Sequence, residues 1–65
     1  MIGHIYEYAG YIYLVVDDDV YRPSIMSDSH DIACVRWVNL TRNGEVSEFA
    51  KRHITRKNST CKRLA

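Results

Sequence analysis

The sequence predicts a mostly β fold, a small SH3-like antiparallel barrel of about five strands with one short helical turn. Three observations lead to this prediction. The chain has 65 residues, which is enough for one small domain. Its hydrophobic content of 46% is that of a folded globular protein. Its runs of tyrosine, valine and isoleucine are short, and Ala9-Gly10 and Asn43-Gly44 separate two pairs of them as turns separate the strands of β-hairpins.

The first two strands are predicted at residues 4–8 and 11–16, which are rich in aromatic and β-branched residues. Gly10 supplies the positive φ that a tight connection between them needs. The acidic triplet at residues 17–19 is expected to end the second strand, because adjacent carboxylates repel one another and are most stable in water. These residues therefore form the first predicted hairpin and a solvated turn after it.

Residues 20–31 are expected to form a long connection. Pro23 cannot donate a hydrogen bond to a strand ladder, and the serines and aspartates that follow have a loop composition. A brief strand is predicted here, around Tyr21 or Ile25.

The second half of the chain predicts another hairpin, with strands at residues 32–40 and 45–49 on either side of Asn43-Gly44. A single helical turn is expected at residues 50–53, before a short strand at Ile54 and Thr55. The domain is thus predicted to occupy residues 1–55, and residues 56–65 form a basic, flexible tail with few apolar anchors.

Two hairpins, a long connection, a helical turn and a final short strand follow one another in the order of an SH3-like barrel. The segments GHIYEYAGYIYLVV (residues 3–16) and WVNLTRNGEV (residues 37–46) resemble small SH3-like barrel proteins of bacteriophage accessory regions. The resemblance extends over residues 3–55 and lies in the pattern of strands and turns. It implies a non-catalytic accessory protein that binds a host protein, modulates its activity and works in the host cytoplasm.

Both faces of the second predicted strand are apolar. Alternation places Tyr11, Tyr13 and Val15 on one face, and Ile12, Leu14 and Val16 on the other. One interpretation is that the hairpin curls and buries both faces within the monomer. Another is that one face binds a protein partner, for which tyrosine is well suited. The residues expected at such a contact, with the arginines setting its orientation, are Tyr6, Tyr8, Tyr11, Trp37, Arg36 and Arg42.

Charge is distributed unevenly along the chain. Residues 1–41 have six acidic and two basic side chains, whereas residues 42–65 have two acidic and seven basic ones. An alternative function is therefore nucleic-acid binding, in which Arg52, Arg56 and Lys57 contact phosphates and Tyr6, Tyr8 or Trp37 stack on bases. A third interpretation is an obligate homodimer whose second subunit covers the exposed hairpin face.

Other classes of function are not favoured by the sequence. The histidines and cysteines lack the close pairs of a structural zinc site, and residues 17–19 lack the spaced ligands of a calcium loop, so neither a metal nor another cofactor is expected. No catalytic motif is visible, which predicts a protein that is not an enzyme. The apolar runs are too short to span a membrane, and two cysteines fit a reducing cytoplasm better than a secreted domain.

Overall fold

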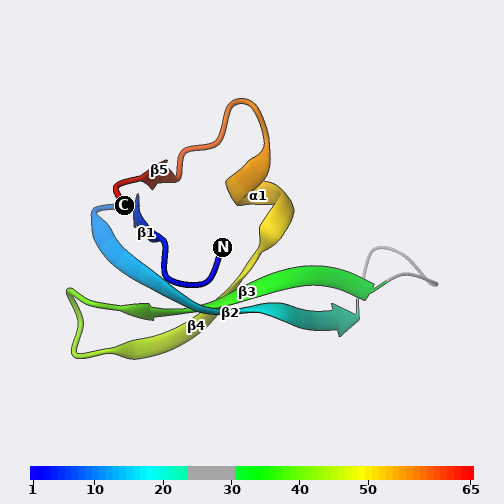
Figure 1. Ribbon diagram of the computed structural model, residues 1–65, viewed down its shortest axis with the longest axis horizontal. Helices are drawn as coiled ribbons and strands as arrows, with labels where there is room; N and C mark the ends of the chain where they lie inside the picture. Colours follow the sequence, from blue (N-terminus) through cyan, green and yellow to red (C-terminus); the bar gives the residue numbers. More distant parts are fainter. Residues whose placement is uncertain (24–30) are drawn as a thin grey trace.

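The computed structural model describes residues 1–23 and 31–65. The elements are β1 (Ile5–Tyr8), β2 (Tyr11–Pro23), β3 (Asp31–Asn39), β4 (Glu45–Ala50), α1 (Lys51–Thr55) and β5 (Lys62–Arg63). The five strands form one antiparallel sheet in the order β4-β3-β2-β1-β5 (Figure 1). The prediction of a mostly β protein with one short helix is confirmed. Within the described residues β4 and β5 do not pair, so the sheet is not closed and a barrel is not confirmed.

A two-residue turn joins β1 to β2. Tyr8 and Tyr11 are cross-strand partners, and Ala9 and Gly10 between them both have positive φ, 53° and 84°. Two consecutive residues of positive φ match the right-handed twist of the flanking strands. Glycine adopts this conformation freely, whereas the Cβ of an alanine makes it unfavourable by roughly 1–2 kcal/mol. Ala9 is therefore a strained residue in an otherwise favourable turn.

Replacing Ala9 with asparagine is expected to raise the free energy of unfolding by about 0.5–1 kcal/mol, because asparagine tolerates positive φ and creates the favoured Asn-Gly turn. Gly10→Ala is expected to lower it, although no atom lies within 4 Å of the added Cβ, because the cost is in the backbone. Urea denaturation of both variants measures these changes. A loss of stability in Ala9→Asn would contradict the turn geometry.

The second strand is longer than predicted. The sequence places its end before Asp17, but β2 continues to Pro23. The pairing of β2 with β3 shifts register between Val15 and Asp17 and again between Asp17 and Val20, so the acidic triplet is accommodated at bulges within the strand. Pro23 is the last residue of β2, where its missing N–H costs little.

Two contacts reduce the repulsion among these carboxylates. The amino group of Met1 donates a hydrogen bond to Asp18 Oδ2 at 3.0 Å, and the N–H of Asp19 donates to Asp17 Oδ1 at 3.1 Å. The prediction that the triplet ends the strand was wrong because these long-range and local contacts are not visible in the sequence. Tyr21 lies in β2, in agreement with the predicted brief strand, and Ile25 lies outside the described residues.

The hairpin at Asn43-Gly44 is confirmed, and both residues have positive φ between β3 and β4. The predicted strand at Ile54 and Thr55 is wrong, since both residues belong to α1. Ile54 takes the helical conformation because this brings its side chain into the core.

The segment expected to be a flexible tail is attached to the sheet. Lys62 and Arg63 pair with Glu7 and Tyr6 of β1. Beyond them the N–H of Leu64 donates to the carbonyl of Ile5, and the N–H of Ile5 donates to the carbonyl of Ala65. The free edge of β1 provides these hydrogen bonds, which compensate for the segment's lack of apolar residues.

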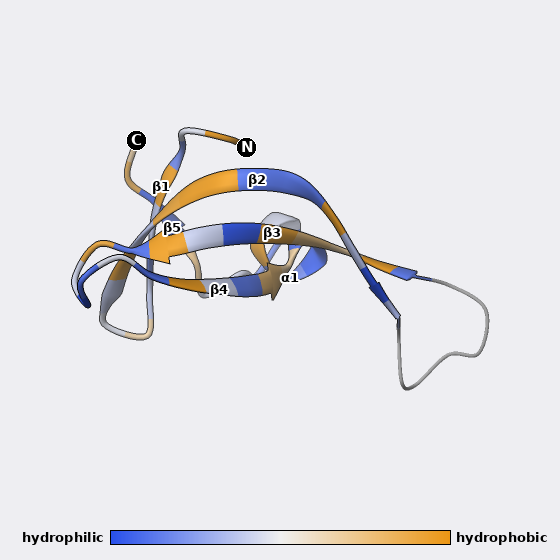
Figure 2. Ribbon diagram, turned by 90° about the horizontal axis from the view of Figure 1, so that it is seen from below, coloured by the Kyte–Doolittle hydropathy of each residue, from blue (hydrophilic) through white to orange (hydrophobic). Residues whose placement is uncertain are grey.

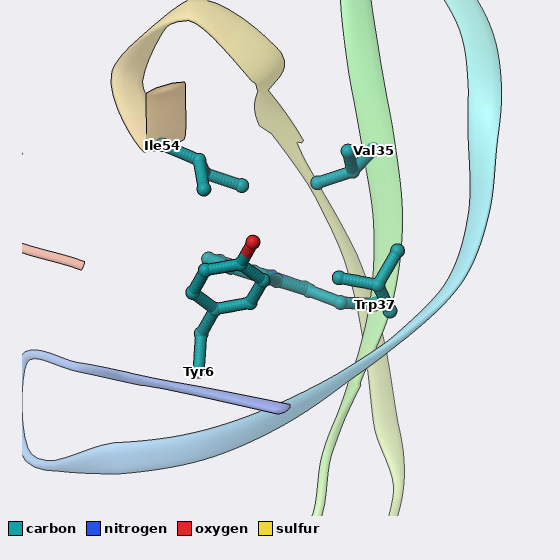
Figure 3. Packing of buried hydrophobic residues seen from close by; sticks show 5 residues of the cluster. Tyr6, Val35, Trp37 and Ile54 are labelled. Atoms are coloured by element: carbon teal, nitrogen blue, oxygen red, sulfur yellow. The ribbon is translucent and has the colours of Figure 1, made fainter. Parts of the chain in front are cut away.

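The main core cluster lies on one face of the sheet, which we call the inner face, and the buried pair Val20 and Cys34 lies outside this cluster. The cluster joins residues of the strands to the helix and consists of Tyr6, Val15, Val35, Trp37 and Ile54. Figure 3 shows Ile54 extending from α1 toward the ring of Tyr6, with Trp37 reaching across from β3. The opposite face of the sheet is called the outer face below.

Candidate interaction surface

Aliphatic side chains form a continuous row on the outer face. Ile5 is the cross-strand partner of Leu14, Leu14 of Val38, and Val38 of Val46. Leu64 continues the β1–β5 register and hydrogen-bonds Ile5 through its backbone. Alternation places all of these side chains opposite the buried inner-face residues. This outer aliphatic row consists of Leu64, Ile5, Leu14, Val38 and Val46.

The ends of the row are open to solvent. Val46 is 58% exposed and Leu64 is 54% exposed, whereas the three middle members are half-buried among their neighbours. Val16 is also exposed, and it lies at the register shift between Val15 and Asp17. Figure 2 shows the hydrophobic first part of β2 beside the hydrophobic end of β3. At strand spacings of about 4.8 Å and a same-face repeat of about 6.8 Å along each strand, the five-residue row covers roughly 160 Å².

An ion-pair network borders the row. Glu48 accepts two hydrogen bonds from the guanidinium of Arg22, at 2.7 and 2.6 Å, and one from Arg36 at 3.2 Å. Arg36 and Glu48 lie two residues from Val38 and Val46 on their strands, and therefore on the same face. Hydrogen bonding from Arg22, reinforced by Arg36, lowers the pKa of Glu48 to about 2. The three side chains leave one net positive charge beside the row.

Acid is expected to destabilise the protein in part through Glu48. Because the pKa of this carboxyl falls from its ordinary value of 4.5 to about 2 on folding, its contribution to stability is complete above pH 4.5 and is lost as the pH falls toward 2. Urea denaturation over this range should show a shallower acid dependence for Glu48→Gln than for the wild type. The Asp18 carboxyl, whose pKa is lowered by hydrogen bonding to the Met1 amino group, retains part of the dependence in both proteins. Identical acid dependence in the two proteins would contradict this role of Glu48.

A tyrosine cluster lies at the end of the inner face near the first hairpin. The ring of Tyr13 stacks on Trp37 with centroids 4.2 Å apart, and Tyr11 meets Tyr13 edge-on at 6.4 Å. The guanidinium of Arg42 lies over the Tyr11 ring, 5.7 Å from its centroid. Burial, and secondarily the neighbouring Tyr11, raise the pKa of the Tyr13 hydroxyl. These side chains pack against one another over much of their surface.

The structure separates the residues predicted to contact a protein partner. Tyr6 and Trp37 are 7% and 2% exposed, so they hold the core together and have little surface to offer. Tyr8 is half-buried and packs on Phe49, with ring centroids 4.8 Å apart. The two predicted arginines contact different groups: Arg42 covers Tyr11 in the tyrosine cluster, whereas Arg36 lies in the ion-pair network of the outer face.

The residues predicted to bind nucleic acid are all exposed. Arg52 lies in α1, Arg56 caps its C-terminal end and Lys57 follows in a turn. Two of the three aromatic rings expected to stack on bases, Tyr6 and Trp37, are buried. The charge for this function is therefore accessible, but most of the predicted stacking platform is not.

One group of side chains in the described part of the chain has the proximity needed to hold a cation. Carboxylate oxygens of Asp17, Asp18 and Asp19 lie within 4.8 Å of one another. The amino group of Met1 already binds Asp18, however, and competes with a cation for it. No helix of the described residues is long and apolar enough to cross a membrane.

Comparison with known proteins identified no relative of this chain. The chain matches no protein-family model, no curated protein and no solved structure.

Sequence reasoning identified only part of the outer face. Alternation in β2 indicated a second apolar face containing Leu14, but the interpretation placed the contact on the tyrosines. Ile5, Val38 and Val46 join Leu14 only through the strand register, and Leu64 lay in the segment expected to be a tail. The signal that was available is the aliphatic face of the second predicted strand.

Proposed function

We propose that this protein is a non-catalytic accessory protein of phage type that binds a host protein in the cytoplasm and modulates its activity through the outer aliphatic row. The observation behind the proposal is the register of this row, which brings aliphatic side chains from successive strands together opposite the core. The helix covers the inner face through Ile54, so the row has no such cover from α1.

Burial of the row supplies a driving force for association. Completely burying an exposed valine or leucine side chain is favourable by about 1.5–3 kcal/mol, and Val46 and Leu64 are each about half exposed. The ion pairs of Arg22 and Arg36 with Glu48 form a polar rim at one side, which favours a defined orientation of the partner.

The proposal includes an SH3-like arrangement of the strands. It is supported by the strand order, in which β5 returns to pair with β1, and by the position of α1 between β4 and β5. This support comes from topology alone, and the function is argued from the outer surface.

The proposal is tested by a tagged pulldown from bacterial lysate, treated with nuclease and analysed by mass spectrometry. The double variant Val46→Lys/Leu64→Lys introduces charge at both exposed ends of the row. The matched control is Tyr21→Lys, which alters another large side chain of similar exposure, 60%. We expect a specific protein to be retained by the wild type and the control and lost by the double variant, with unchanged circular dichroism in all three.

Other outcomes would overturn the proposal. Retention of the host protein by the folded double variant would exclude the row as the binding surface. Loss of the host protein in Tyr11→Ala alone would place the contact on the tyrosine cluster. Recovery that disappears with nuclease, and binding that weakens steeply as salt rises, would favour the nucleic-acid alternative through Arg52, Arg56 and Lys57.

A further inference from the structure

The two edges of the sheet differ in their protection against further pairing. β5 is two residues long and consists of Lys62 and Arg63, and short, basic edges resist the addition of another strand. β4 has six residues, contains no proline or lysine, and keeps one unbroken register with β3 from Cys34↔Ala50 to Asn39↔Glu45. The edge of β4 that faces away from β3 carries a regular series of backbone hydrogen-bond donors and acceptors. β4 is therefore the edge suited to pairing with another strand.

We propose that β4 pairs antiparallel with β4 of a second copy of this chain, about a two-fold axis normal to the sheet. Such an axis keeps the outer face of one copy on the same side as the outer face of the other. Residues that oppose each other must then lie on the same face, which allows Val46, Ser47 or Glu48 at the axis.

Charge and length select among these registers. With Glu48 at the axis, two carboxylates oppose each other directly, which is unfavourable. With Val46 at the axis, the ordered strands overlap only over residues 45–47. With Ser47 at the axis, the ordered strands overlap over residues 45–49, Val46 opposes Glu48 of the second copy, and no like charges oppose each other directly.

The pairing also enlarges the outer apolar surface. Val46 ends the outer aliphatic row at the β4 edge, and in this register it lies diagonal to Val46 of the second copy. Two rows of roughly 160 Å² each then lie side by side, which gives roughly 320 Å² of apolar surface, within the size range of patches that often have a function. The self-pairing is argued from the edge alone and does not depend on the proposed function.

Cysteine scanning along β4 tests both the association and its register. Ser47→Cys is expected to give a disulfide-linked dimer under mild oxidation, since directly opposed Cβ atoms lie within about 5.5 Å. In Val46→Cys and in Glu48→Cys, the introduced cysteines of the two copies lie diagonal to each other. These variants should therefore cross-link far more slowly. The wild type is the control for the native Cys34 and Cys61. Cross-linking that is fastest at 46 or 48, or absent at all three positions, would overturn the proposed pairing.

A measurement on the wild type keeps the test valid if Ser47→Cys folds poorly through loss of the hydrogen bond from Trp37 Nε1. Sedimentation equilibrium should give twice the monomer mass of 7.6 kDa, with dissociation on dilution. Hydrogen exchange at the β4 amides should slow as the protein concentration rises. A monomer at every concentration overturns the inference. A dimer that retains no host protein leaves the inference standing and contradicts the proposed function instead.

Discussion

Replacing Trp37 with alanine is expected to lower the free energy of unfolding by about 3–5 kcal/mol, a large part of the total for a domain of this size. The side chain is 2% exposed and bridges three strands. Its ring lies between those of Tyr13, at 4.2 Å, and Phe49, at 4.9 Å, both nearly parallel to it. Its Nε1–H donates a hydrogen bond to Ser47 Oγ at 2.9 Å. The truncation therefore removes two aromatic stacks and leaves a cavity.

The measurement is urea denaturation followed by far-ultraviolet circular dichroism, because the variant lacks the chain's single tryptophan. Trp37→Phe retains a ring but loses the hydrogen bond, and should fall between the wild type and alanine. Tyr21→Ala, at an exposed position, should change stability little. A folded Trp37→Ala variant of wild-type stability would refute the core role and favour the sequence-based prediction that Trp37 is a partner contact.

Replacing Ile54 with alanine is expected to cost about 2–5 kcal/mol. Ile54 is the buried residue of α1 and belongs to the core cluster with Tyr6 and Trp37. A helix of five residues has little stability of its own, and α1 has no side-chain hydrogen bond at its N-cap. The packing of Ile54 therefore stabilises the helix and keeps it in place over the inner face.

Arg52→Ala is the matched control, because Arg52 lies in the same helix with an exposed side chain and alanine favours helix formation. Thermal and urea denaturation should separate the two variants clearly. In addition, hydrogen exchange in Ile54→Ala should show loss of protection in α1 before β3. Equal stability of the two variants would contradict the packing of α1 on the core.

Local features of the sequence predicted the hairpins well. Ala9-Gly10 and Asn43-Gly44 mark turns through backbone preferences of the residues themselves, and alternation of side chains marks the strands around them. Features that depend on distant residues were missed. Asp17 and its neighbours stay within β2 because strand pairing and the Met1 amino group accommodate them, and Lys62 and Arg63 are ordered by the edge of β1.

The candidate site shows the same division. Sequence alone placed Tyr11 and Tyr13 on one face of β2 and Leu14 on the other, because a strand alternates its side chains whatever it pairs with. Only the tertiary structure decided which face became the core. Trp37, from β3, stacks on Tyr13 and on Phe49 of β4, which makes the aromatic face the buried one. Register then aligns the aliphatic residues across the outer face. Composition and alternation are local properties of a chain, whereas burial and register are properties of strands brought together.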